Sequence, residues 1–326
     1  MTVKKKSMSK QEVLQTLQKH LQTAIALEHS TLPPYLSAYW SIYGTSSNAE
    51  HAKKFLLSII QEEMLHMAMA CNILNAIGGT PVLNDGALLP CFPCALPGHS
   101  KTNNAFTVHL NKCCPQAIAE FIKIEMPEVM IANKHHADGW CTIGEFYDEI
   151  EALIKHDALQ DSDFAGGRQL GASFNPAKGT LYTVNSRQDA LNALDEIIDQ
   201  GEGHAANLYD KDHQLTHYWR FLAIRDLMEN EIWNYRADVY DMAPDPDEAF
   251  FSDEAKQLNL AFNNAYSELL DSMQAAFTST TPSLDAAIGL MFKLKKPAHQ
   301  LMNIPLVGKK GNAGPTFKYI SLDQRK

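Results

Sequence analysis

The stretch IQEEMLHMAMA, residues 60–70, places Glu63 and His66 in an otherwise apolar helical pattern. Residues three apart lie on one face of a helix, so these two side chains point in the same direction. The helix is expected to begin at the cap sequence Ser47-Asn48-Ala49-Glu50 and to end at Gly78-Gly79. A carboxylate inside a protein is strongly unfavourable unless it is paired or bound to a metal ion. The stretch therefore predicts a helix that carries part of a polar site on its buried face.

Two further predicted helices carry a carboxylate within an apolar stripe. The first opens at a capping box, residues 9–12, and contains Glu28 among its apolar positions. Another begins at Pro115, a residue that suits the first position of a helix. It runs past Glu125, which is in phase with its apolar side chains, whereas Glu120 is out of phase and is the weaker candidate. Glu28 and Glu125 are therefore expected to join the site.

A fourth predicted helix, residues 187–202, carries Glu202 in phase with its apolar side chains. Helix resumes around Gln214 and places His217 on an apolar face. Because Glu202 and His217 are far apart along the chain, they meet only if the residues between them bulge out as an insertion. His204 and His213 compete with His217 for the position of the second histidine.

Four predicted helices each place a carboxylate or a histidine on an apolar face. A dinuclear metal site would explain all of them together. In ferritin-like di-iron bundles, two helices give one Glu each and the other two give Glu-x-x-His. The candidate ligands are therefore Glu28, Glu63, His66, Glu125, Glu202 and His217. Carboxylate and imidazole donors suit two iron ions, and manganese or a mixed iron–manganese pair fits the same donors. Glu62 is interpreted either as a solvated carboxylate or as a partner that hydrogen-bonds a ligand histidine from outside the site.

Composition limits the classes of partner. The chain has 326 residues, of which 45% are hydrophobic and 20% charged, as in ordinary soluble globular proteins. Its net charge of -10 argues against nucleic-acid binding and offers no basic face to anionic lipid. No apolar run approaches the ~20 residues of a membrane-spanning helix, and no secretory signal follows the N-terminal lysines, so a cytoplasmic location is expected. The cysteines are then interpreted as reduced thiols, because the pairs Cys91/Cys94 and Cys113/Cys114 lack the rest of a zinc-finger pattern.

The pattern predicts an all-α fold, a four-helix bundle with long loop insertions, minor β structure and additional C-terminal helices. A flexible segment, residues 1–8, is expected before a single helical domain, residues 9–305, and residues 306–326 form a tail. Insertions are expected at about 80–114 and 137–187, where residues typical of turns are frequent.

Eight segments that follow one another between about residues 10 and 320 match a known family. They are ALEHSTLPPYL, EEMLHMAMACNILNAIGG, ALPG, FIKIEMPE, FAGGRQ, IIDQGEGH, HYWRFLAI and AGPTFKY. Together they resemble the ferritin-like domain of the iminophenyl-pyruvate dimer synthase family, found in the violacein- and rebeccamycin-pathway enzymes that couple two oxidised aromatic amino acids. The resemblance implies a ferritin-like bundle and carries over the same six residues as metal ligands.

The predicted site and the resemblance favour a non-haem di-iron oxidase or oxygenase that acts on a small organic substrate with dioxygen. The resemblance also implies oxidative coupling of an amino-acid-derived imine. Two alternatives stay open, a metal storage or detoxification protein and a non-catalytic ferritin-like binding protein. A homo-oligomer is compatible with the sequence, and so is an amino-acid oxidase or a reductase as partner.

Overall fold

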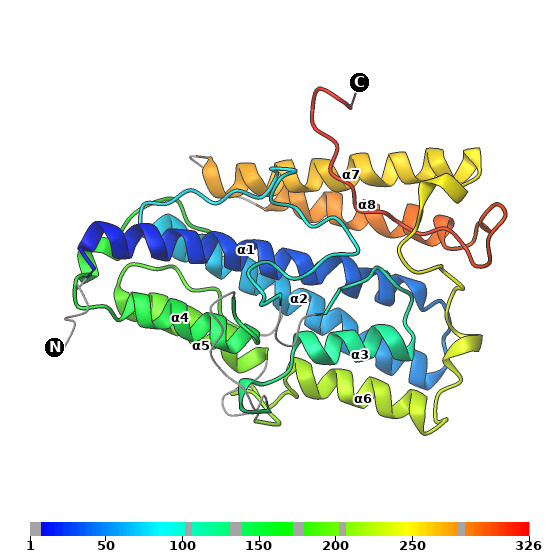
Figure 1. Cartoon of the computed structure of the whole chain (residues 1–326), viewed down its shortest axis with the longest axis horizontal. Helices are drawn as coiled ribbons and strands as arrows, with labels where there is room; N and C mark the ends of the chain where they lie inside the picture. The colour runs from blue at the N-terminus through cyan, green and yellow to red at the C-terminus, as the bar shows by residue number, and fades with distance from the viewer. Residues whose placement is uncertain are drawn as a thin grey trace.

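Two long helices joined by a short loop form the middle of the molecule (Figure 1). The computed structural model describes residues 8–101, 106–130, 139–171, 179–201, 207–279 and 284–325. Helix α1 spans Lys10–Ser41 and α2 spans Ser47–Ala76, and the two pack against each other along the bundle. The predicted capping box starts α1, because the Ser9 hydroxyl accepts the backbone N–H of Glu12 while the Glu12 carboxylate accepts that of Ser9.

Helix α2 begins one residue earlier than the sequence predicted. Its N-cap is Ser46, whose hydroxyl accepts the backbone N–H of Ala49. The helix ends before Gly78, which has a φ of 76° and so adopts the left-handed conformation that closes many helices. The expected glycine stop is confirmed.

The third and fourth helices of the bundle are each broken into two pieces. Their bounds are α3 Pro115–Ile124, α4 Ile143–Ile154, α5 Arg187–Gln200 and α6 His217–Glu229. Helix α3 packs against α6, and α4 packs against α5 (Figure 1). The backbone N–H of His217 donates to the carbonyl of Gly201 at 3.0 Å, so α6 starts where α5 stops. Glu125 directly follows α3 and His217 opens α6, which puts both residues at the breaks.

These breaks correct the predicted helix ends. The third helix was expected to run past Glu125, but Glu125 is its C-cap. Pro127 explains the earlier end, because a proline disfavours helical geometry at the residue before it. Helix α6 begins at His217, later than the predicted resumption around Gln214.

A second pair of helices covers α1 and α2 on the side away from α3–α6 (Figure 1). Helix α7 spans Asp253–Thr278 and α8 spans Asp285–Leu301. The C-terminal tail packs on this layer and on α1. The side chains of Asn259 and Asn263 hydrogen-bond Thr316, and the Phe317 ring stacks on Trp40 with centroids 6.1 Å apart.

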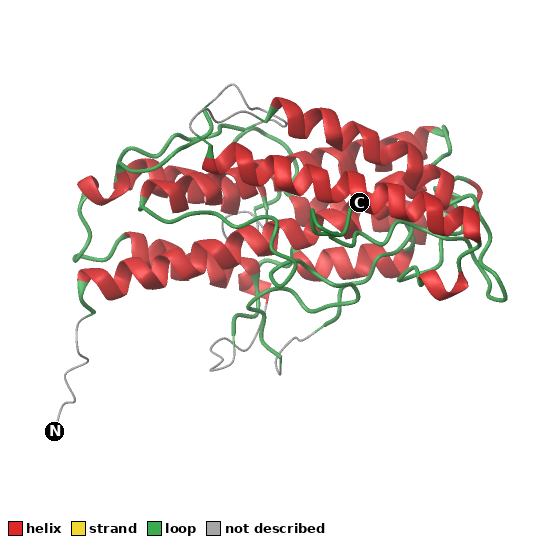
Figure 2. Ribbon diagram, turned by 90° about the horizontal axis from the view of Figure 1, so that it is seen from above, coloured by secondary structure: helices red, strands yellow, loops and turns green. Residues whose placement is uncertain are grey.

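Long loops connect the helices (Figure 2). Within the described residues the extended pieces form only isolated bridges, such as Cys94 with Val108, so the predicted minor β structure is limited to these contacts. Short 3-10 turns occur at η1 Glu128–Met130, η2 Asp161–Phe164, η4 Tyr235–Ala237 and η5 Glu248–Phe250. All six cysteines are free, and four of them are buried.

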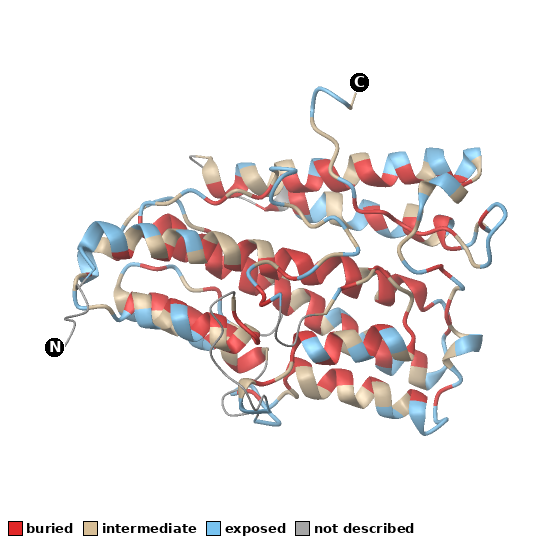
Figure 3. Cartoon of the chain, viewed as in Figure 1, coloured by how far each residue is buried: buried red, intermediate tan, exposed pale blue. Residues whose placement is uncertain are grey.

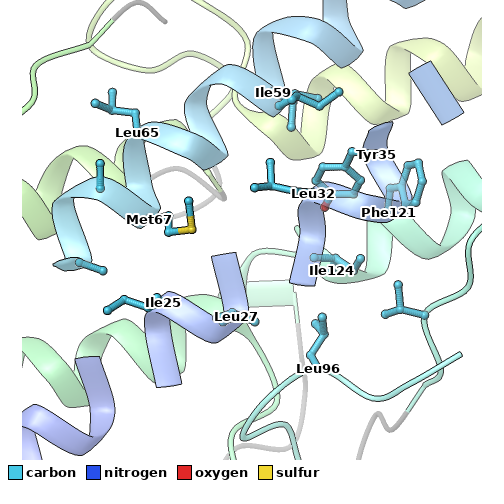
Figure 4. Packing of buried hydrophobic residues seen from close by; sticks show 14 of the residues in the cluster. Ile25, Leu27, Leu32, Tyr35, Ile59, Leu65, Met67, Leu96, Phe121 and Ile124 are labelled. Atoms are coloured by element: carbon cyan, nitrogen blue, oxygen red, sulfur yellow. The ribbon is translucent and has the colours of Figure 1, made fainter. Parts of the chain in front are cut away.

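Buried residues concentrate where α1 and α2 face their neighbours on both sides (Figure 3). Close packing of residues such as Ile25, Leu65 and Phe121 forms one continuous apolar core (Figure 4). None of the described helices is long and apolar enough to cross a membrane. Polar and charged side chains are also buried in this core, and each of them needs a hydrogen-bond or charge partner there.

Candidate metal centre

Five of the predicted ligands meet inside the bundle, at the level of the two helix breaks. Glu28 comes from α1, Glu63 and His66 from α2, Glu125 from the end of α3 and His217 from the start of α6. All five side chains are buried. They form two overlapping groups, Glu28 with Glu63 and His66, and Glu63 with Glu125 and His217. Within each group the donor atoms lie within 4.8 Å of one another, and Glu63 belongs to both.

The two histidines direct the same ring atom at this cluster. The Nδ1 atom of His66 lies 3.7 Å from Oε2 of Glu28 and 3.8 Å from Oε1 of Glu63. The Nδ1 atom of His217 lies 3.0 Å from the same oxygen of Glu63 and 3.5 Å from Oε2 of Glu125. The two imidazole rings are 5.5 Å apart, centroid to centroid.

A glutamine fixes the tautomer of His66. Glu196 can only accept a hydrogen bond when ionised, and its Oε1 takes one from Nε2 of Gln200 at 3.0 Å. The amide oxygen of Gln200 is thereby directed to His66, 3.0 Å from its Nε2. Because this oxygen needs a donor, the proton of His66 resides on Nε2 and the lone pair of Nδ1 faces the carboxylates.

The carboxylate of Glu62 orients the ring of His217 in the same way. Its Nε2 lies 2.8 Å from Oε2 of Glu62, which also accepts a hydrogen bond from Nη1 of Arg220 at 2.6 Å. The expected role of Glu62 beside a histidine is thus confirmed. The Nδ1 atom of His217 is buried and makes no hydrogen bond, although it lies close to Glu63 and Glu125. A buried nitrogen without a hydrogen-bond partner, aimed between carboxylates, is the arrangement that a cation would satisfy.

Hydroxyl groups hold the carboxylates in place from behind. The phenol of Tyr147 donates to Oε1 of Glu28, and that of Tyr35 donates to Oε1 of Glu125 at 2.6 Å. The hydroxyl of Thr31 lies 2.5 Å from Oε2 of Glu63. Each carboxylate therefore keeps one oxygen on a protein donor and presents the other to the cluster.

The cluster concentrates negative charge in a buried place. Burial raises the pKa of Glu28 to about 7, and the hydrogen bond from Tyr147 opposes this while the nearby Glu125 charge adds to it. Burial and then the charges of Glu125 and Glu28 raise the pKa of Glu63 to about 7. Burial would lower the pKa of His217, but the surrounding carboxylates outweigh it and raise that pKa well above its usual value. Positive charge is favoured at this point in the protein.

A small cavity of about 20 Å³ adjoins the cluster. It has room for about one water-sized molecule. Its walls combine candidate ligands with apolar side chains and with Gly201, namely Glu28, Glu63, His66, Glu125, Ile143, Gly144, Tyr147, Ile197, Ile198 and Gly201. The cavity is therefore a place where one water-sized molecule could sit beside the ligands.

The other candidate residues from the sequence are either outside the described residues or outside the cluster. Glu202 and His204 lie outside the described residues, although Gly201, the neighbour of Glu202, lines the cavity. His213 is exposed, so of the histidines compared for the second position, His217 is the described one that reaches the cluster. Glu120 is outside the cluster and accepts a hydrogen bond from the backbone of His109.

Several residues that support the cluster were not predicted to do so. They include Tyr35, Tyr147, Gln200 and Arg220. Two carried a local signal, because Tyr35 follows Glu28 by two helical turns and Arg220 follows His217 by one. Tyr147 and Gln200 reach their partners across 119 and 134 positions of sequence, which no local pattern can reveal.

Comparison with known sequences finds distant relatives along most of the chain. Dichlorochromopyrrolate synthase of Lentzea aerocolonigenes is 24% identical over 311 residues, which cover 81% of this chain and 29% of the relative. The 2-imino-3-(indol-3-yl)propanoate dimerase of Chromobacterium violaceum is 25% identical over 288 residues, 80% of this chain and 27% of the relative. The chain thus spans less than a third of the length of these relatives.

Comparison with solved structures supports the fold. A ferritin-like protein from Caulobacter vibrioides superposes with a TM-score of 0.70 at 22% identity, over 93% of this chain and 97% of that one. Residues 21–226 match the Ferritin-like family, and this range holds most of α1, all of α2 to α5, most of α6 and the buried cluster of carboxylates and histidines. The chain therefore belongs to the Ferritin-like family.

Proposed function

We propose that this chain binds two metal ions and is a non-haem dinuclear oxidase or oxygenase. Glu28, Glu63 and His66 would hold one ion, Glu63, Glu125 and His217 the other, with Glu63 between them. The buried Nδ1 of His217 carries this proposal, because it is aimed between the carboxylates of Glu63 and Glu125, where a metal ion would be held. Glu202, which is outside the described residues, stays the predicted sixth ligand, and its sequence neighbour Gly201 lines the cavity.

Iron is the metal that we propose, with manganese or an iron–manganese pair as the other candidates, since carboxylate and imidazole donors suit all of these. A dinuclear iron centre supplies the electrons and binding sites that dioxygen activation needs. The protein supplies geometry: Gln200 and Glu62 orient the histidines, and Tyr147 and Tyr35 hold the carboxylates. The apolar walls around the small cavity would keep bulk water away from the reaction.

The proposed substrate is a small imine derived from an aromatic amino acid, and the proposed reaction is its oxidative coupling. The two relatives support this class, one being named for dimerising 2-imino-3-(indol-3-yl)propanoate. Joining two molecules by a new carbon–carbon bond removes two hydrogen atoms, and dioxygen would accept them to give hydrogen peroxide. A cytoplasmic location and an amino-acid oxidase that supplies the imine are part of the same proposal.

An assay with a coupled oxidase tests this function. The chain, loaded with ferrous iron under anaerobic conditions, is mixed with tryptophan and an L-amino-acid oxidase, and coupled products are followed by mass spectrometry. We expect a dimeric product that the metal-free chain and the His66→Ala variant do not form. Equal product with and without the iron-loaded chain would contradict the coupling reaction. Uptake of many more than about two irons per chain would favour metal storage instead.

The pH dependence of metal binding follows from the raised pKa values of Glu28 and Glu63. With a pKa of about 7, each carboxyl is about nine-tenths protonated at pH 6 and about one-tenth protonated at pH 8. Metal ions bind the deprotonated form, so binding at pH 6 must displace these protons. We expect over one more proton released per chain at pH 6 than at pH 8, and tighter binding at pH 8.

Calorimetric titration with manganous ion measures this difference. The same titration in two buffers of different ionisation enthalpy gives the number of protons released at each pH. The Glu149→Gln variant is the control, because Glu149 is exposed, pairs with His20 and is not among the candidate ligands. An equal number of protons at both pH values would contradict the assignment of Glu28 and Glu63 as ligands.

A further inference from the structure

A second cavity lies on the other side of α2, between the central helices and the α7–α8 layer. Its volume is about 490 Å³, which is within the range of small-molecule sites. Its lining is mostly apolar and comprises Leu36, Tyr39, Trp40, Leu57, Ile60, Gln61, Met64, Met67, Ala68, Leu269, Met273, Phe277, Leu284, Ala287, Ile288, Met291, Phe292 and Lys295. No candidate metal ligand is among them, and none of them lines the cavity beside the metal centre. The two sites are therefore separate.

The walls of this cavity suit a flat aromatic body. Four methionines line it, Met64 and Met67 from α2, Met273 from α7 and Met291 from α8. Methionine is flexible, and its sulfur makes favourable contacts with aromatic rings. Aromatic side chains also line the cavity, and rings prefer offset or edge-to-face contact with other rings. An aromatic ligand could therefore contact methionine and aromatic side chains of both helical layers.

The mouth of the cavity is basic. Lys295 lines both the cavity and an adjoining groove of about 430 Å³, which continues along α8 past Lys296 and His299. The Lys295 ammonium lies 5.9 Å from the ring centroid of Tyr39, and no carboxylate pairs with it among the residues that the structure describes. Burial, followed by the charges of Lys295 and Lys53, lowers the pKa of His299, which reflects the positive field here. In a chain with a net charge of -10, a lysine at an apolar opening that has no carboxylate partner among the described residues favours an anion.

We propose that this cavity binds an organic anion with an aromatic body, the rings between α2 and α7–α8 and the acidic group at Lys295. The cavity volume is large enough for the aromatic rings of such a ligand. Lys295, beside an otherwise apolar lining, can bind its acidic group. A second copy of this chain is the other occupant to consider, because Phe292 is 75% exposed at the same mouth. The basic groove favours the anion, since a second copy would bring the same lysines against one another.

Binding of naphthalene-2-carboxylate to the full chain tests this site. Isothermal titration calorimetry is performed on the metal-free protein, so the result does not depend on the proposed oxidase function. We expect saturable binding with one site per chain that weakens at high salt. Lys295→Glu should weaken it at least about tenfold. Lys293→Glu, the same charge change two residues away and outside the cavity lining, should alter it no more than about twofold.

One further variant and one further ligand test which chemical group the cavity binds. Ala287→Phe places a ring inside the cavity and should abolish binding while the fold, monitored by circular dichroism, is kept. Dodecanoate carries an alkyl chain with the same head group and should bind more weakly. Equal effects of Lys295→Glu and Lys293→Glu, or tighter binding of dodecanoate, would overturn the proposal. So would a dimer in sedimentation experiments that dissociates on Phe292→Asp and excludes the naphthoate.

Discussion

Replacing Glu63 with glutamine is expected to remove both metal ions from the chain and, at the same time, to stabilise the metal-free protein. Glu63 belongs to both groups of candidate ligands, whereas Glu28 belongs to one. The wild-type chain should therefore bind about two ions, Glu63→Gln close to none and Glu28→Gln about one. Plasma mass spectrometry after anaerobic loading and desalting measures these ratios, and Glu149→Gln should bind as the wild type does.

The stability effect has the opposite sign because the buried carboxylate is unfavourable without a cation. A carboxyl whose pKa is raised in the folded state stabilises the fold at low pH, and this contribution is lost as pH rises through the folded value, here about 7. Above that pH, glutamine avoids burying a charge, so metal-free Glu63→Gln should be about 1–3 kcal/mol more stable at pH 8. The gain should shrink towards pH 5. Metal retained by Glu63→Gln, or a less stable variant at pH 8, would contradict the shared-ligand geometry.

The sequence predicted the helices where hydrophobic periodicity is strong and local. The cap sequences and the 3.6-residue pattern placed the start of α1 and both ends of α2 within one or two residues, because capping residues or glycine mark these ends. Glu63 and His66 were found for the same reason, since a three-residue spacing fixes a shared face whatever the rest of the chain does.

The sequence predicted an interruption between residues 202 and 217, but it did not reveal that the third helix ends at the site. Periodicity continued past Glu125, although Pro127 was the local signal for an earlier end. The second break is set by the contact between His217 and Gly201, which depends on how the chain between them folds back. Both breaks allow a residue at a helix terminus to turn inward where an unbroken helix would present a fixed face.

The sequence could not predict the supporting side chains either, because each of them is identified only by the residue that it contacts in the folded chain. Tyr147 meets Glu28, and Gln200 meets His66, only after the bundle has closed. Glu62 was expected beside a histidine, since it adjoins a predicted ligand, but its partner Arg220 was not. Residues that bind metals carry spacing rules, whereas residues that orient them need only a hydrogen bond.

Replacing Arg220 is expected to lower the free energy of unfolding more than most single substitutions do. Its side chain is 2% exposed, and it donates hydrogen bonds to Glu62, to the Ser58 hydroxyl and to the carbonyl of Leu215. Burial would raise the pKa of Glu62, but His217 and Arg220 outweigh it and lower that pKa. Arg220→Met would leave a buried carboxylate short of a cation, which typically costs about 3–5 kcal/mol.

Urea denaturation of the metal-free chain measures this cost. Arg225→Met is the matched control on the same helix, because Arg225 is partly exposed and pairs only with exposed neighbours, and it should change stability by no more than about 0.5 kcal/mol. The double variant Glu62→Gln with Arg220→Met should recover over about 1 kcal/mol relative to the sum of the single changes, since it removes the stranded charge. A loss below about 1 kcal/mol for Arg220→Met would mean that water or His217 replaces the guanidinium. In that case Glu62 could orient His217 without Arg220, and the buried ion pair would not be what positions this histidine.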